Sequence, residues 1–146
     1  MDAALNIITY KDRTVAELKK KLTEKGYGLS EIEDVIAKLA EYNYVDDQRY
    51  AIHFAKGRSE SRGARVIRME LKNKGVSDSL IALAMEELDV DESETVEKLL
   101  RRRYGNENLR DEKIRSRAYG FLLRRGFSYD TISRAISLLY TESESS

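Results

Sequence analysis

The feature that most constrains this chain is an internal repeat marked by three glycines. Gly26, Gly75 and Gly126 lie 49 and 51 residues apart. Apolar residues recur at five offsets from each glycine: four before it, and one, six, ten and thirteen after it. These columns are Leu22, Leu71 and Leu122; Tyr27, Val76 and Phe127; Ile32, Ile81 and Ile132; Ile36, Met85 and Ile136; and Leu39, Leu88 and Leu139. Five such columns in register predict three copies of one structural unit.

Each glycine stands where a helix is expected to end. A helix often closes with a residue in the left-handed conformation, which glycine adopts at the least cost. The apolar residues six, ten and thirteen positions later lie on one face of a following helix. Ser30, Ser77 and Ser128 are expected to cap these helices, and Ser30 with Glu33 has the spacing of a capping box. A further helix precedes each pair, and the clearest one has Asp46 as its N-cap.

The sequence therefore predicts an all-α fold of three tandem three-helix repeats. Repeats 1, 2 and 3 are expected at residues 1–43, 44–90 and 91–140, with a disordered polar tail at 141–146. We expect helices at residues 2–11, 14–25, 30–42, 46–59, 62–74, 78–88, 92–103, 111–125 and 129–140. Because a three-helix unit has only a thin core, neighbouring repeats must stack to bury their apolar faces. This stacking predicts an elongated array that can curve.

Composition narrows the possible classes of protein. The chain has no cysteine, which excludes disulfides, thiolate metal sites and cysteine nucleophiles. It also has no proline and only 8 glycines, too few turn-forming residues for a typical all-β fold. No secretory signal and no apolar run long enough for a membrane span is evident, so we expect a cytoplasmic protein without membrane contact. The 26 basic and 26 acidic residues cancel, so net charge gives no signature of nucleic-acid binding.

Three segments carry a more specific pattern. They are YVDDQRYAIHFAKGR at 44–58, GARVIRMELKNKGV at 63–76 and RGFSYDTISRAI at 125–136. In these segments the chain resembles the RecX family, regulators of the bacterial recombinase RecA. The chain departs from the family pattern at Ala64, where relatives often have proline, and at Tyr50, where phenylalanine is commoner. The resemblance implies a tandem three-helix fold, no cofactor, no catalytic residues, and binding in the groove of the RecA–DNA filament that limits its growth or activity.

Two groups of basic residues are the candidate partner-binding residues. The first group lies around the expected helix 62–74 and contains Arg58, Arg62, Arg65, Arg68, Lys72 and Lys74. The second group contains Arg101, Arg102, Arg103, Arg110, Arg115, Arg117, Arg124 and Arg125. Guanidinium groups pair bidentately with carboxylates and phosphates, which suits both protein and nucleic-acid partners. The alternative for the first group is a solvated helix face balanced by Glu60 and Glu70, with Ile67 and Leu71 facing the core.

Three classes of function remain to be compared. The leading hypothesis is a monomeric regulator that binds the RecA filament, with DNA as a further contact within or beside it. The alternative is a helical protein that binds nucleic acid directly through its arginines. An enzyme is disfavoured because no catalytic constellation is evident: helix capping accounts for Asp46 and Asp47, and His53 lies in mid-helix without a second ligand.

Overall fold

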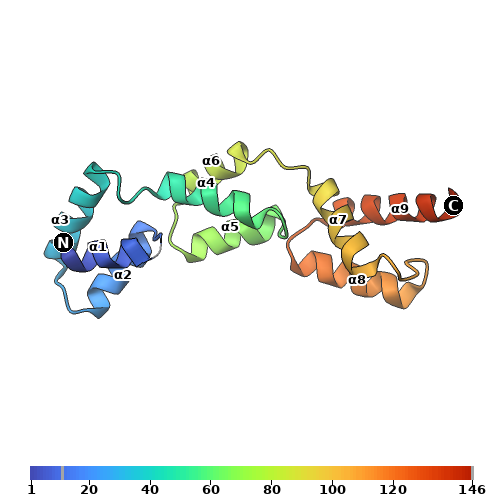
Figure 1. Ribbon diagram of the computed structural model, residues 1–146, viewed down its shortest axis with the longest axis horizontal. Coiled ribbons are helices and arrows are strands. Elements are labelled where there is room, and N and C mark those ends of the chain that lie inside the picture. The colour runs from blue at the N-terminus through green and yellow to red at the C-terminus, as the bar shows by residue number, and fades with distance from the viewer. Residues whose placement is uncertain (11, 146) are drawn as a thin grey trace. The chain divides into compact units, whose positions relative to one another are not determined.

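The secondary structure is helical throughout the part of the chain that the structure describes. This computed structural model describes the backbone of residues 1–10 and 12–145, and the side chains of residues 1–8 and 12–140. Within these limits it contains nine helices and no strand, which confirms the predicted fold class (Figure 1). The helices are α1 (Asp2–Tyr10), α2 (Val15–Glu24), α3 (Leu29–Glu41), α4 (Asp47–Arg58), α5 (Ala64–Asn73), α6 (Asp78–Glu87), α7 (Glu92–Tyr104), α8 (Glu112–Arg124) and α9 (Tyr129–Ser145).

The last helix is longer than the sequence predicts. α9 continues through residues 141–145, a segment that we expected to be disordered. The segment 129–145 contains neither glycine nor proline, so nothing in it terminates the helix. Residue 146, the end of the expected tail, and residue 11, the end of the expected first helix, lie outside the described residues.

The three repeat glycines end helices as predicted. Gly26, Gly75 and Gly126 have φ angles of 93°, 85° and 97°, all in the left-handed region. The residue after each glycine donates its amide to the carbonyl of the leucine four positions before that glycine. The N–O distances are 3.2, 3.1 and 3.2 Å. This bond pattern is the Schellman motif, in which the residue after the glycine folds back onto the last turn. A fourth motif of the same kind ends α3, where Asn43 takes the left-handed conformation with a φ of 60°.

Two of the three predicted serine caps are present. The hydroxyls of Ser77 and Ser128 accept hydrogen bonds from the amides three residues later, at 3.4 and 3.2 Å. The prediction for Ser30 is wrong, because α3 begins one residue earlier, at Leu29. Gly28 is the N-cap of that helix, and no side chain caps it. Ser30 therefore lies inside the first turn, beyond the position from which a hydroxyl caps a helix.

The chain folds as two compact units, described separately here. Unit 1 comprises Met1–Ala55 and Arg68–Leu88, and unit 2 comprises Lys56–Ile67 and Asp89–Ser146. In unit 1, a core cluster on α1 to α3 and the loop that follows α3 contains Ala4, Ile7, Leu18, Leu22, Ile32, Ile36, Leu39 and Val45. In unit 2, the core cluster contains Val96, Leu99, Leu100, Leu109, Ala118, Phe121, Leu122, Phe127, Ile132, Ala135 and Ile136. The division falls within α4 and within α5, so the residue boundaries expected for the three repeats stay a prediction.

Candidate partner-binding surface

Helix α5 carries exposed basic side chains beside a buried apolar face. Arg65, Arg68 and Lys72 are exposed. Ile67 and Leu71 on the same helix are 1% and 0% exposed, which confirms that they face the core. The Lys72 ammonium lies 3.8 Å from the carboxylate of Asp78, but both side chains are exposed. Since exposed ion pairs contribute little, this pair leaves Lys72 accessible to a partner.

The remaining members of the first group have different surroundings. Arg58 is exposed at the end of α4, and Arg62 lies half-buried just before α5. Lys74 is half-buried as well, and its Nζ lies 3.8 Å from Glu17 Oε2 and 5.5 Å from the centre of the Phe54 ring. The charge of Lys74 is therefore used inside unit 1, unlike that of the exposed residues of α5.

Unit 2 brings members of the two basic groups together. Arg65 Nη2 donates to the carbonyl of Leu123, in the last turn of α8, at 2.7 Å. The amide of Gly63 donates to the carbonyl of Arg125 at 2.8 Å. Arg125 Nη1 in turn donates to the carbonyl of Ser61 at 3.4 Å. The segment before α5 and the end of α8 therefore cross closely, and the crossing places Arg65 against the last turn of α8.

An aromatic ring holds two of these guanidinium groups. The guanidinium carbons of Arg103 and Arg125 lie 4.3 and 4.7 Å from the centre of the Phe121 ring. The ring is 9% exposed and belongs to the core of unit 2. A guanidinium packed on an aromatic face gains from the quadrupole of the ring and loses conformational freedom. We call Arg62, Arg65, Arg103 and Arg125 the arginine cluster.

Positive charges within the arginine cluster repel one another. The pKa of Arg125 is lowered, first by its burial and then by the positive charges of Arg62 and Arg103. Within the described residues, no carboxylate forms an ion pair with Arg62, Arg103 or Arg125. Like charges that lack an internal counterion attract an anionic group from outside. The cluster is therefore suited to bind a carboxylate or a phosphate.

The rest of the second basic group divides into two sets. Arg101, Arg110 and Arg115 have partners within the fold: the Glu97 carboxylate at 2.9 Å, the ring of Tyr140 with its centre at 5.9 Å, and the Tyr140 hydroxyl at 2.6 Å. Arg102, Arg117 and Arg124 are exposed on α7 and α8. The sequence does not separate these sets, because the separation depends on which side chains of α7, α8 and α9 meet.

The acidic pair at the start of α4 has two different roles. The Asp46 carboxylate accepts the amide of Arg49 at 3.2 Å, which confirms the predicted cap. The Asp47 carboxylate instead accepts the amide of Val15, the first residue of α2, at 2.9 Å. Sequence reasoning missed this contact, because it joins residues 32 positions apart. His53 is exposed, as expected for a residue in mid-helix.

Neither a metal-ion site nor a membrane-spanning helix is present among the described residues. No group of three or more histidine, aspartate and glutamate side chains among them is placed to hold a metal ion. None of the helices described above has the length and apolar character needed to cross a membrane.

Comparison with known proteins gives the same family along the whole chain. Models of the first, second and third three-helix domains of RecX match residues 1–39, 46–85 and 90–136. The regulatory protein RecX of Vibrio campbellii is 36% identical over 141 residues, which are 93% of this chain and 88% of that protein. The regulatory protein RecX of Mycobacterium sp. strain JLS is 36% identical over 132 residues, which are 85% of this chain and 72% of that protein.

Solved structures agree with the sequence relatives. The crystal structure of RecX from Lactobacillus salivarius superposes with a TM-score of 0.76 at 29% identity, covering 96% of this chain and 94% of that chain. A second crystal structure, of a regulatory protein RecX, superposes with a TM-score of 0.78 at 26% identity, covering 92% of this chain and 69% of that chain. Three matching domain models, relatives matched over most of their length and a shared fold lead to one conclusion: the chain belongs to the RecX family of regulatory proteins.

Proposed function

We propose that this protein binds the RecA–DNA filament and limits the growth or the ATPase activity of that filament. Membership of the RecX family supports this proposal at the level of the whole chain. The observation that carries it at the level of residues is the arginine cluster, which gathers positive charge from three segments without an internal carboxylate. The protein acts in this proposal by binding, and no residue of the chain performs chemistry.

The chemistry of the cluster fits an acidic partner surface. Arg103 and Arg125 are held against Phe121, so their guanidinium planes lose little further freedom when they bind. A guanidinium can donate two parallel hydrogen bonds to a carboxylate or to a phosphate. Within unit 2, the exposed Arg65 brings the same charge onto the first turn of α5. Complementary charge of this kind accelerates association and fixes the orientation of the partner.

The experiment measures DNA-dependent ATP hydrolysis by the cognate RecA in the presence of this protein. The test variant combines Arg62→Gln with Arg103→Gln, which removes two charges from the cluster and leaves the buried part of the core untouched. The matched control combines Lys19→Gln with Lys38→Gln, which removes two exposed charges from α2 and α3. Circular dichroism melting of both variants checks that they are folded.

The wild-type protein should suppress hydrolysis, and the cluster variant should require at least about tenfold more protein for the same suppression. The control variant should behave as the wild type. Equal suppression by the two variants would show that the cluster does not contact the filament. An unchanged hydrolysis rate with the wild-type protein, at concentrations well above that of RecA, would contradict the proposed function itself.

Direct binding to nucleic acid is a separate outcome of a second measurement. Binding to DNA without RecA, followed by fluorescence anisotropy, should weaken with salt by a log–log slope of about −0.9 for each phosphate contacted. The alternative, direct binding to nucleic acid, would be favoured by two results together: a slope that corresponds to several phosphate contacts, and an affinity for DNA alone equal to the affinity for the filament. We expect weaker binding to DNA alone, because the net charge of the chain is zero.

A further inference from the structure

Neighbouring repeats meet at two junctions that use the same arrangement. The first junction joins the start of α2 to the end of α5 and lies within unit 1. The second junction joins the start of α5 to the end of α8 and lies within unit 2. In each, one repeat supplies the N-terminus of a helix and the next repeat supplies hydrogen-bond acceptors. Helix N-termini need such acceptors, since their first amides have no partner within the helix.

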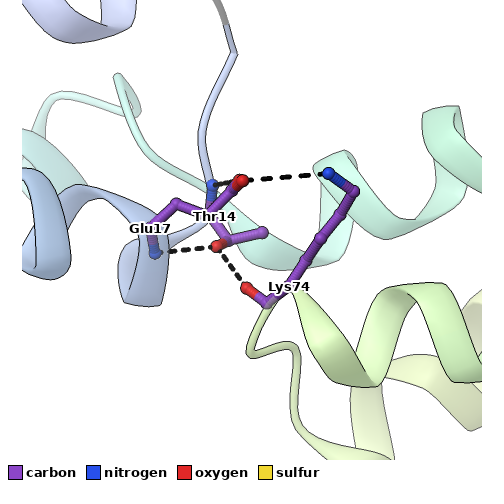
Figure 2. Close-up of polar contacts among 3 residues, drawn as sticks. All are labelled: Thr14, Glu17 and Lys74. Carbon is purple, nitrogen blue, oxygen red and sulfur yellow. Dashed lines mark hydrogen bonds and ion pairs between the residues drawn. The ribbon is translucent and has the colours of Figure 1, made fainter.

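The first junction is centred on Thr14. Its hydroxyl donates to the carbonyl of Lys74 at 2.6 Å and accepts the amide of Glu17 at 3.1 Å (Figure 2). The Glu17 carboxylate accepts the Thr14 amide at 3.1 Å and lies 3.8 Å from the Lys74 ammonium. The amide of Val15, the next residue, donates to the Asp47 carboxylate at 2.9 Å. Repeat 2 therefore supplies two acceptors to this helix start, the carbonyl of Lys74 and the carboxylate of Asp47.

The second junction repeats these bonds at equivalent positions. The amide of Gly63 donates to the carbonyl of Arg125 at 2.8 Å. The amide of Ala64 donates to the Glu92 carboxylate at 2.8 Å. Gly63 precedes its repeat glycine by twelve residues, as Thr14 does, and Arg125 directly precedes a repeat glycine, as Lys74 does. Glu92 is the first residue of α7, as Asp47 is of α4.

The repeat glycines also take part in the junctions. A Cβ atom on Gly75 would lie 2.2 Å from the Cβ of Ala16, the second residue of α2. A Cβ atom on Gly126 would lie 2.8 Å from the backbone nitrogen of Val66, in the first turn of α5. A Cβ atom on Gly26 would have no neighbour within 4 Å. The turns that follow the second helix of repeats 2 and 3 are therefore covered by the preceding repeat, whereas the equivalent turn of repeat 1 is open.

Repeat 1 has the hydrogen-bond acceptors of such a junction, but among the described residues no helix N-terminus donates to them. Asp2 is the first residue of α1 and lies 45 residues before Asp47, which lies 45 residues before Glu92. The carbonyl of Lys25 directly precedes Gly26. Within the described residues, neither the Asp2 carboxylate nor the Lys25 carbonyl accepts a hydrogen bond.

The surroundings of these two acceptors are exposed and close together. Met1, Ala3 and Tyr27 line one shallow pocket, so the start of α1 lies beside the turn at Gly26. Tyr27 is 41% exposed, whereas the equivalent residues Val76 and Phe127 are 4% and 2% exposed. The apolar side chain that is buried in the two covered turns is thus uncovered in the open one, where it is the ring of Tyr27.

We infer that Asp2, Lys25, Gly26 and Tyr27 form a docking surface for the N-terminus of a helix from a partner protein. This inference goes beyond the proposed function, since it uses none of the arginine cluster. The two junctions define the chemistry of the partner helix: a small residue before its first turn, as Thr14 and Gly63 are, and free amides in that turn. The positive end of a helix dipole is also complementary to the Asp2 carboxylate.

A second copy of this chain does not fit the surface through its last repeat. α8 begins at Glu112, and its N-terminus is already capped within repeat 3. The Asp111 carboxylate accepts the amides of Lys113 and Ile114 at 2.9 and 3.5 Å. The amide equivalent to those of Val15 and Ala64 is that of Arg115, eleven residues before Gly126, and it donates to the carbonyl of Asp111 at 2.9 Å. Because this donor is already used within repeat 3, that repeat does not offer a free donor half, and we assign the occupant to a different protein.

The test fuses to the chain a helix N-terminus that already docks in this way, the start of α2, so that it is held close to the proposed surface. A copy of residues 1–45 is fused directly before Met1, which places Thr14 of the added copy 33 residues before the original Asp2, as Thr14 precedes Asp47 in the native chain. Amide exchange and chemical shifts are followed by NMR. One control fusion carries Asp2→Ala in the original chain. The other carries Val15→Pro in the added copy, which removes the donated amide at a helix position where proline is well tolerated.

We expect the added copy to shift the resonances of the original Gly26 and Tyr27. The amide of Val15 in the added copy should exchange at least about tenfold more slowly than in the Asp2→Ala fusion. The Val15→Pro fusion should show reduced shifts at Gly26 and Tyr27. An added copy that stays unfolded, or that leaves these resonances as they are in the unfused chain, would overturn the inference. Unchanged resonances of residues 89–140 show in each fusion that the original chain is folded.

Discussion

Equivalent glycines differ in what surrounds them, and substitutions can measure the difference. Gly26 and Gly75 share a left-handed conformation, with φ angles of 93° and 85°. Replacing Gly26 by alanine should cost about 1 kcal/mol, because a Cβ atom disfavours this conformation. Gly75→Ala should cost at least about 1 kcal/mol more, since its Cβ would also collide with Ala16. Urea unfolding of the two variants measures both free energies.

The comparison has its own internal control. Both substitutions carry the same conformational cost, so their difference isolates the contact with Ala16. Equal free energies of unfolding for Gly26→Ala and Gly75→Ala would mean that the first junction is looser than described. Periodicity in the sequence predicts the conformation of all three glycines, because that conformation depends on local chain geometry. It does not predict the contact, which depends on how two repeats pack.

The Asp47 carboxyl is partly removed from water at the first junction. Burial raises its pKa above the usual value of 3.8, and the hydrogen bond from Val15 only partly opposes this effect. A carboxyl with a raised pKa stabilises the fold most at low pH, and that contribution is lost as the pH rises through the folded-state pKa. Asp47→Asn keeps the acceptor oxygen without the charge. The variant should therefore gain stability relative to the parent as the pH rises above 3.8.

Thermal melts of the parent and the variant across the acidic range test this expectation. Asp47→Ala is the matched comparison, because it removes the charge and the acceptor together. It should destabilise the chain at every pH by about 1 to 3 kcal/mol, the cost of an unpaired buried amide. A stability difference between the parent and Asp47→Asn that does not change with pH would contradict a raised pKa.

At the scale of elements, the start of α2 depends on one hydroxyl. Thr14 is 0% exposed, and its hydroxyl both caps α2 and donates to Lys74 in α5's C-terminal turn. Thr14→Val keeps the shape of the side chain and removes both bonds. The free energy of unfolding should fall by about 2 kcal/mol, the combined cost of a lost cap and an unpaired buried carbonyl.

The exposed cap of α9 serves as the control for this prediction. Ser128 accepts an amide of α9 and donates to the Thr131 hydroxyl, and among the residues that the structure describes it makes no bond to another repeat. Ser128→Ala should cost about 1 kcal/mol or less, the usual effect of an exposed cap. If Thr14→Val costs no more than Ser128→Ala in urea unfolding, the bond to Lys74 does not stabilise the first junction.

The helices themselves were largely predictable from sequence, and their starts less so. Apolar periodicity fixes which segments are helical, and the repeat glycines mark where three of the helices end. The start of α3 was predicted one residue late, because Ser30 is a good cap by type but Gly28 takes that position. The end of α3 at Asn43 gave no glycine signal, although asparagine tolerates the same conformation.

At the scale of the whole molecule, the chain divides into two units with separate cores. Leu100 is 0% exposed in the core of unit 2, and Leu18 is 0% exposed in the core of unit 1. Leu100→Ala should cost about 2 to 5 kcal/mol. Because contacts in repeat arrays are mainly between neighbours, amide exchange should accelerate more in residues 89–140 than in residues 1–55. Leu18→Ala should give the reverse pattern, and uniform acceleration in both variants would indicate a single cooperative unit.

For the candidate surface, the sequence predicts the residue types but not which of them lie together in the fold. The sequence marks the right kind of residue, since arginines dominate both basic groups. It treats Arg62 and Arg125 as members of separate groups, because they are far apart along the chain. The backbone crossing between Gly63 and Arg125 brings them together. In unit 1, the first junction places the Lys74 ammonium beside Glu17. Neither result follows from local periodicity.

The crossing at Gly63 has a consequence for the fidelity of folding. A chain of similar repeats risks pairing the wrong neighbours while it folds. A Cβ atom at Gly63 would lie 2.3 Å from the carbonyl oxygen of Gly126, so a helix that begins with threonine cannot take this place. Helix α2, whose N-cap is Thr14, therefore fits against repeat 2 and not against repeat 3. The difference between threonine at position 14 and glycine at the equivalent position 63 thus helps to determine which repeats pair as the chain folds.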